Sequence, residues 1–172
     1  MRNFFAILFF GSLIIFPFYA ESTHSDWGAK AADLNSSPDL ADMLRYAIED
    51  EYLARAEYAA IMKEFGSQRP FSNIMKAEET HIGWLRDVYA RLQMTIPEDR
   101  AKDYVVLPKS LEDAYRAGVQ AEIDNIAMYD HFLSTDIIRK PENDFVADVF
   151  VRLRDASKNH LSAFRNALNR NK

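Results

Sequence analysis

The chain has 172 residues, a length that fits one domain of ordinary size. Its 26 acidic residues outnumber 21 Lys and Arg and give a formal charge of -5, so its long-range field repels phosphate backbones and we expect no nucleic-acid partner. There is no cysteine, which excludes disulfides, thiolate metal ligands and cysteine nucleophiles. Any metal ion would need nitrogen and oxygen ligands.

The N-terminus has the layout of a secretory signal peptide over residues 1–20. Arg2 supplies a positive charge, residues 4–19 are almost all apolar, and Ala20 is a small residue where the polar sequence begins. We expect cleavage after Ala20 and a periplasmic or secreted protein. The alternative is an uncleaved membrane anchor with the folded part facing outward, although this apolar run falls just short of the roughly 20 residues that a spanning helix needs. Membrane contact is expected only through such an uncleaved segment.

Residues 21–37, ESTHSDWGAKAADLNSS, show no sustained apolar period and carry Ser, Asn, Asp and Gly. The composition predicts a flexible linker in which His24 and Trp27 are incidental. The folded domain is then expected over residues 38–172.

Four long amphipathic segments follow, over residues 38–65, 70–92, 110–134 and 141–169. Ser37 followed by Pro38 predicts the start of the first helix, and Gly66 its end. Ser110 with Asp113 resembles a capping box at the start of the third. Because no window alternates with period two over a useful length, the sequence predicts an all-α protein.

The connections between these helices favour a four-helix bundle of two antiparallel hairpins. Two connections are short, whereas residues 93–109 form a connection of 17 residues. Such a segment spans up to ~56 Å, which exceeds the ~34 Å length of a 23-residue helix. It is long enough to cross the whole bundle, which is a known topology for this fold class.

Five polar residues interrupt the apolar seams of these helices: Glu51, Glu78, His81, Glu122 and His160. In an antiparallel hairpin, residues equidistant from the turn lie at equal height. Glu51 and His81 both lie 15 residues from Gly66, and Glu122 and His160 both lie 19 residues from Pro141. We therefore expect one polar layer through the core, within about a turn, ~5 Å.

This layer predicts a metal site. A buried ionised carboxylate is costly unless it is paired or bound to a metal, and the seams offer no Lys or Arg as a partner. A divalent cation would satisfy all five side chains. Oxygen and imidazole ligands suit Fe, Mn or Zn.

The pattern also repeats between the two hairpins. Glu51 with Tyr58 precedes Glu78-x-x-His81, and Glu122 with Tyr129 precedes Ser157-x-x-His160. This resembles the ferritin-like carboxylate proteins, which use a Glu from each of two helices and Glu-x-x-His from the other two to hold two iron or manganese ions.

More narrowly, four stretches resemble a prokaryotic ferritin-like family known as domain of unknown function 2202, over residues 38–168: EDEYLARAEY, FSNIMKAEETH, AEIDNI and SKNHLSAF. The resemblance implies a ferritin-like bundle and an iron or manganese centre whose ligands are Glu51, Glu78, His81, Glu122 and His160. It implies no settled activity.

Ser157 stands where the wider superfamily has a fourth carboxylate. Two divalent ions bring four positive charges, of which three carboxylates balance three, while with one ion the same carboxylates leave one negative charge. One or two ions of Fe or Mn, with Zn as a further possibility, therefore stay open. Asn125 or a water held by Ser157 is available to fill the gap.

No catalytic residue is assigned. Tyr58 and Tyr129 are expected to be packing residues that donate hydrogen bonds to ligands, with electron donation as the alternative. Asp124, Asp130 and His131 leave the seam and are expected at the surface.

Three functions are compatible with these residues. The leading hypothesis is an exported metal-dependent oxidase or ferroxidase-like enzyme acting on Fe(II), O2 or peroxide. The second is non-catalytic metal binding or delivery, and the third is a structural bundle with a vestigial polar layer. Metal ions are the expected partners, and the chain is expected to be a monomer or homodimer.

Overall fold

The computed structural model describes residues 26–170, which are all-α. Within these residues there is no strand, and the five α-helices are α1 (Gly28–Asp33), α2 (Leu40–Phe65), α3 (Phe71–Arg91), α4 (Leu111–Ser134) and α5 (Asp144–Arg170). Two short 3-10 helices, Ala101–Asp103 and Pro141–Asn143, lie in the connections. The predicted signal segment, residues 1–20, lies outside the described residues.

Two of the long helices, α2 and α4, begin at a residue whose side chain caps them, whereas Pro70 at the start of α3 offers no such cap. At α4 the predicted cap is confirmed, because Ser110 Oγ accepts the backbone N–H of Asp113 at 3.1 Å and donates to its carboxylate at 2.8 Å. At α2 the predicted cap, Ser37, is wrong. Asp39 caps this helix instead, since its carboxylate accepts the N–H of Asp42 at 2.8 Å.

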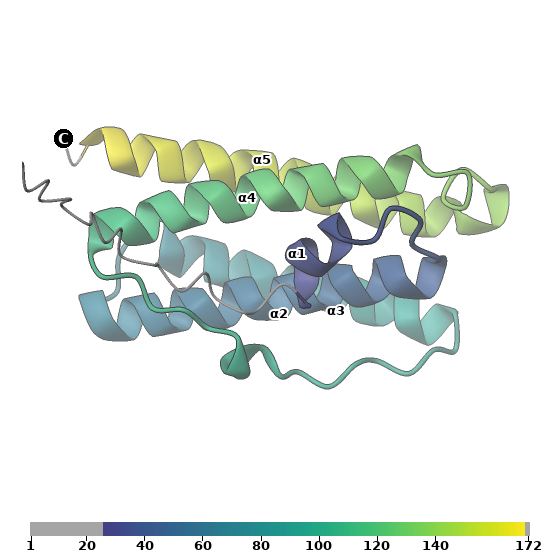
Figure 1. Ribbon diagram of the computed structural model, residues 1–172, viewed down its shortest axis with the longest axis horizontal. Helices are drawn as coiled ribbons and strands as arrows, with labels where there is room; N and C mark the ends of the chain where they lie inside the picture. The colour runs from purple at the N-terminus through teal and green to yellow at the C-terminus, as the bar shows by residue number, and fades with distance from the viewer. Residues whose placement is uncertain (1–25, 171–172) are drawn as a thin grey trace, which may run out of the picture.

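The long helices pack in two pairs, α2 with α3 and α4 with α5, and the pairs meet through α2 with α4 and α3 with α5 (Figure 1). Short turns join the members of each pair. The connection from α3 to α4 runs along the outside of the helices (Figure 1), and its 3-10 helix rests on α2. None of the helices in residues 26–170 is long and apolar enough to cross a bilayer.

The apolar core is divided into two clusters along the helix axes. One is built on Leu44, Leu85 and Phe150, and the other on Phe71 and Phe164, all fully buried. The helical segments between the two clusters carry the polar residues that interrupt the seams. The division therefore marks the height of the predicted polar layer.

The segment before α2 differs from the expected linker. Residues 28–33 form α1, which contacts both α2 and α4. Trp27 is buried, its Nε1 donates to the Glu49 carbonyl at 2.9 Å, and its ring stacks on Tyr104 at 4.4 Å between centroids. Trp27 is thus an anchoring residue, contrary to the interpretation that it is incidental.

Gly118 makes room for a ring of the second cluster. A Cβ at this position would lie 2.7 Å from Phe164 Cζ, and Phe164 is held between Tyr58 and Phe71. Gly83 is the natural comparison, because a Cβ there meets nothing within 4 Å.

We expect Gly118→Ala to destabilise the protein by about 1–3 kcal/mol, because overpacking outweighs the gain of about 1 kcal/mol in helix propensity. Gly83→Ala should instead stabilise it by ~0.5–1 kcal/mol. Urea unfolding followed by circular dichroism measures both. A stabilising Gly118→Ala would show that the Phe164 ring moves aside freely.

Candidate metal centre

Five side chains from all four long helices meet in one layer. They are Glu51 on α2, Glu78 and His81 on α3, Glu122 on α4 and His160 on α5. Four of them are buried, and the His160 side chain is 12% exposed. The structure therefore brings together every residue that the sequence predicted as a ligand.

Glu78 lies at the middle of this layer and faces both histidines. Its Oε2 is 2.6 Å from His81 Nδ1, which is also 3.1 Å from Glu51 Oε2. Its Oε1 is 3.4 Å from His160 Nδ1, which is also 3.4 Å from Glu122 Oε1. The layer thus consists of two groups, each with two carboxylates and one imidazole, that share Glu78.

Each group offers three ligand atoms within 4.8 Å of one another. The first group is Glu51, Glu78 and His81, and the second is Glu78, Glu122 and His160. Carboxylate oxygens and imidazole nitrogens are suitable donors for Fe, Mn and Zn, so the residues present fit a divalent ion.

Two buried tyrosines form hydrogen bonds between α2 and α4 across the layer. Tyr58 Oη on α2 donates to Glu122 Oε1 on α4 at 3.1 Å, and Tyr129 Oη on α4 donates to Glu51 Oε1 on α2 at 3.1 Å. Burial raises the pKa of both phenols well above the ordinary value, and neighbouring carboxylates raise it further. Both hydroxyls therefore stay protonated and orient the carboxylates, as the sequence predicted.

The carboxylates of the layer differ in their protonation. Burial raises the pKa of Glu78 well above its ordinary value, and the charges of Glu51, Glu122 and Asp50 add to this effect. Burial also opposes ionisation of Glu51, but hydrogen bonds from His81, Glu78 and Tyr129 outweigh it and lower the pKa of Glu51. Among residues 26–170 the ion-pair partners of these carboxylates are His81 and His160, with no Lys or Arg. Of Glu51 and Glu78, Glu78 is therefore the carboxylate that more readily holds a proton.

Ser157 is buried but bonded away from the two groups. Its Oγ donates to Asn125 Oδ1 at 2.7 Å and lies 3.2 Å from the Leu153 carbonyl. Asn125 Nδ2 in turn donates to the Asp50 carboxylate. Asn125, which sequence analysis offered as a substitute ligand, is thus engaged with Ser157 and Asp50.

Asp50 is the residue that sequence analysis missed. Its carboxylate also accepts the backbone N–H of Ala29 at 2.9 Å, so it joins α1 to the layer. Burial raises its pKa to about 7, and the charges of Glu51 and Glu122 contribute. The only signal in the sequence is its position beside Glu51, off the apolar seam.

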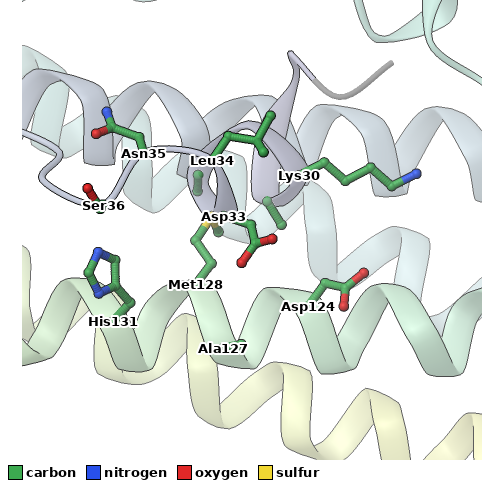
Figure 2. Close-up of a pocket in the computed structure, with 11 residues that line it drawn as sticks. Lys30, Asp33, Leu34, Asn35, Ser36, Asp124, Ala127, Met128 and His131 are labelled. Atoms are coloured by element: carbon green, nitrogen blue, oxygen red, sulfur yellow. The ribbon is translucent and has the colours of Figure 1, made fainter. Parts of the chain in front are cut away.

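One surface pocket lies away from these groups. It has a volume of about 570 Å³, lies between α1 and α4, and contains none of the five candidate ligands (Figure 2). Figure 2 shows Met128 reaching from α4 towards α1, with Asp124 and His131 on either side. His131 is exposed, and exposed Asp130 pairs with Arg154 at 3.2 Å, as expected for surface residues.

A second pocket, of about 340 Å³, is lined by Asp50 and Glu57 together with Lys30. Burial raises the pKa of Glu57 to about 7, against the opposing effects of Lys30 and the backbone N–H of Val106. Two carboxylates of raised pKa, Asp50 and Glu57, therefore line one pocket and belong to neither three-residue group.

The class of protein defined so far is an all-α, bundle-like protein with a buried carboxylate–histidine cluster. A solved structure, that of hypothetical protein MJ0754 from Methanococcus jannaschii DSM 2661, superimposes with a TM-score of 0.66 over 78% of this chain and 82% of that chain. The two sequences are 23% identical, so the similarity shows a shared fold alone. No family model matches the chain, and no curated protein matches it.

Replacing Glu78 by Gln should leave the metal-free protein almost as stable as the wild type. Gln keeps the volume, one donor and one acceptor of the protonated carboxyl. In chelator we expect a change of less than ~1 kcal/mol, against the ~3–5 kcal/mol expected when one partner of an ionised buried pair is removed. Thermal melts measure it, with Glu79→Gln on the same helix as the exposed control. A large loss confined to Glu78→Gln would show that Glu78 is ionised without metal.

The raised pKa of Glu57 should make the free energy of unfolding fall as the pH rises. Its folded pKa, about 7, lies above the unfolded value of 4.5, so the folded state binds more protons between these values. This contribution is fully present below pH ~4 and is lost as pH rises through ~7. We expect Glu57→Gln to match the wild type at pH 4 and to melt about 2–4 °C higher at pH 8, after discounting the shift for partial exposure. Equal melting temperatures at both pH values would contradict the raised pKa.

Proposed function

We propose that this chain is a ferritin-like metal-binding protein whose long helices form a four-helix bundle around one or two divalent ions. Iron or manganese is the first expectation and zinc the second. The observation that carries the proposal is the pair of three-residue groups that share Glu78, with ligand atoms within 4.8 Å in each. The sequence resemblance to the family known as domain of unknown function 2202 points to the same class, although no family model matches the chain.

The chemistry of the donors supports a cation rather than a permanently metal-free layer. Three buried carboxylates face two imidazoles, and no Lys or Arg in residues 26–170 pairs with them. The charge of such a set can be offset either by protons or by a bound cation. Binding of the cation should therefore release a proton, and affinity should rise with pH.

Each side chain has a distinct task in this proposal. Glu51 and His81 hold one position, Glu122 and His160 hold the other, and Glu78 serves both. Tyr58 and Tyr129 keep the outer carboxylates oriented by their crosswise hydrogen bonds. The apolar clusters on either side of the layer limit the access of water, and the partly exposed His160 marks the side nearer to solvent.

When bound, iron or manganese would supply one-electron exchange with O2 or peroxide, which zinc cannot supply. The proposed activity is therefore an oxidase or ferroxidase-like reaction, outside the cytoplasm if the signal-like layout of residues 1–20 directs export.

Ser157 favours a second candidate function, non-catalytic metal binding or delivery. Its hydroxyl is bonded to Asn125 rather than to the layer, so one ligand position of the symmetric pattern carries no carboxylate. Stable occupancy without turnover would favour this alternative.

The test is metal loading of the protein obtained by expressing the full chain. Anaerobic reconstitution with Fe(II), Mn(II) or Zn(II), followed by desalting and mass spectrometry, should give one or two ions per chain and a metal-dependent rise in melting temperature. Glu122→Gln should lose metal, while Glu79→Gln, which alters an exposed residue on the same helix as Glu78, should not. No bound metal and no thermal shift would leave the structural bundle as the function.

Oxygen uptake separates the first two candidates. The Fe(II)-loaded protein should consume O2 faster than the same Fe(II) in buffer, and Glu122→Gln should remove the difference. Metal-loaded protein without faster uptake of O2 or peroxide would favour binding or delivery.

A further inference from the structure

A chain of hydrogen-bonded side chains runs beside the metal-ligand layer. Its three members, which we call the Asp50 relay, are Asp50, Asn125 and Ser157. Ser157 Oγ donates to Asn125 Oδ1 at 2.7 Å, and Asn125 Nδ2 donates to the Asp50 carboxylate. The relay thus crosses the bundle from α5 through α4 to α2.

Each member of the relay sits within one helical turn of a candidate ligand. Asp50 directly precedes Glu51 on α2, Asn125 follows Glu122 by three residues on α4, and Ser157 precedes His160 by three residues on α5. The relay and the layer are therefore fixed to each other by the same three helices.

The relay ends on a carboxylate that has no cationic partner. Asp50 accepts hydrogen bonds from Ala29 N–H and from Asn125 Nδ2, and it forms no ion pair with any residue in the range 26–170. When Asp50 is ionised, no Lys or Arg in these residues is paired with it, and its neighbours are the hydrogen-bond donors of Ala29 and Asn125. Glu57, the other carboxylate of the same pocket, differs because Lys30 is its cationic neighbour and the relay does not reach it.

The two hydrogen bonds of the relay are aligned in one direction, from Ser157 towards Asp50. Both donors point their hydrogens towards Asp50, so the dipoles of Asn125 and Ser157 align, and each polarises the next. Ser157 Oγ directs its proton to Asn125 and lies 3.2 Å from the Leu153 carbonyl. Ser157 occupies, in the repeated pattern, the position that Glu78 occupies in the other hairpin.

Charge balance then identifies the task of the relay. Two divalent ions bring four positive charges, and Glu51, Glu78 and Glu122 balance three of them. A fourth negative charge inside the same low-dielectric region would balance the charge of both ions. Asp50 is the carboxylate that the structure connects to the position where this charge is missing.

We propose that Asp50 replaces the fourth ligand carboxylate of the metal centre, acting as a positioning residue through Asn125 and Ser157, so that the centre holds two divalent ions. This inference rests on the proposed metal-binding function and goes beyond it by fixing the stoichiometry and naming the residue on which the second ion depends.

The test is a titration of the full-chain protein with Mn(II), in which free Mn(II) is measured by electron paramagnetic resonance. The wild type should bind two ions per chain and show the signal of a coupled manganese pair at saturation. Asp50→Asn should weaken binding of the second ion at least tenfold and lose the pair signal. The matched control, Glu57→Gln, removes a carboxylate from the same pocket and should still bind two ions.

A double variant that moves the carboxylate distinguishes a role of the Asp50 charge from a purely structural role of the Asp50 side chain. In the double variant Asp50→Asn/Ser157→Glu, the carboxylate moves to the ligand position itself, so the second ion and the pair signal should return. If Asp50→Asn alone loses the second ion and the folded double variant does not regain it, the charge-balance role is overturned. If Asp50→Asn binds two ions as tightly as the wild type, the inference is overturned directly.

Two further outcomes distinguish this inference from the function on which it rests. A wild type that binds one ion overturns the inference and leaves metal binding standing, whereas no binding overturns both. Should Asp50→Asn melt below the assay temperature, Ser157→Ala decides, because it breaks the relay but keeps the Asp50 carboxylate. A weakened second ion in Ser157→Ala supports the relay, and unchanged binding overturns it.

Discussion

The burial of three carboxylates and two imidazoles at one height is the constraint around which these helices are arranged. Removing such groups from water is unfavourable unless each finds a partner, and no Lys or Arg is available to them in residues 26–170. In the described residues no deeply buried side-chain N or O atom lacks a hydrogen-bond partner. The shared Glu78 makes this possible, since one side chain serves both histidines.

The same requirement joins the two helix pairs. Tyr58 and Tyr129 each bond a glutamate on the opposite pair, so α2 and α4 are tied in both directions at the height of the layer. On either side of the layer, two separate apolar clusters hold the helices together. Apolar contacts are not directional, so they fix the position of one helix along another less strictly than hydrogen bonds do. A shift of one helix by a turn would separate these partners and leave buried charged groups without hydrogen bonds.

The sequence predicted the all-α class and the layer because both follow from local signals. Helix periods placed Glu51, Glu78 and His81 on inward faces, and equal distances from Gly66 and Pro141 placed the two hairpins at matching heights. What could not be predicted depends on tertiary contacts. Trp27 and α1 carry too few residues to show a period, and they are ordered by Glu49 and Tyr104, which lie far away in sequence. Asp50 points off the seam, so periodicity assigned it to no core face.

Residues 27–29 are connected to the polar layer through Asp50. Gly28 adopts a left-handed backbone with φ of +59°, where a Cβ would lie 2.8 Å from the Asp50 carboxylate, and the next residue, Ala29, donates its N–H to that carboxylate. Trp27 anchors this turn on Glu49, one residue before Asp50. The docking of residues 27–29 therefore fixes Asp50, Asp50 fixes Asn125, and Asn125 fixes Ser157. Because each hydrogen bond has a defined direction, a change in the packing of α1 would alter the position of Ser157. This is the position at which one hairpin carries Ser and the other carries Glu78.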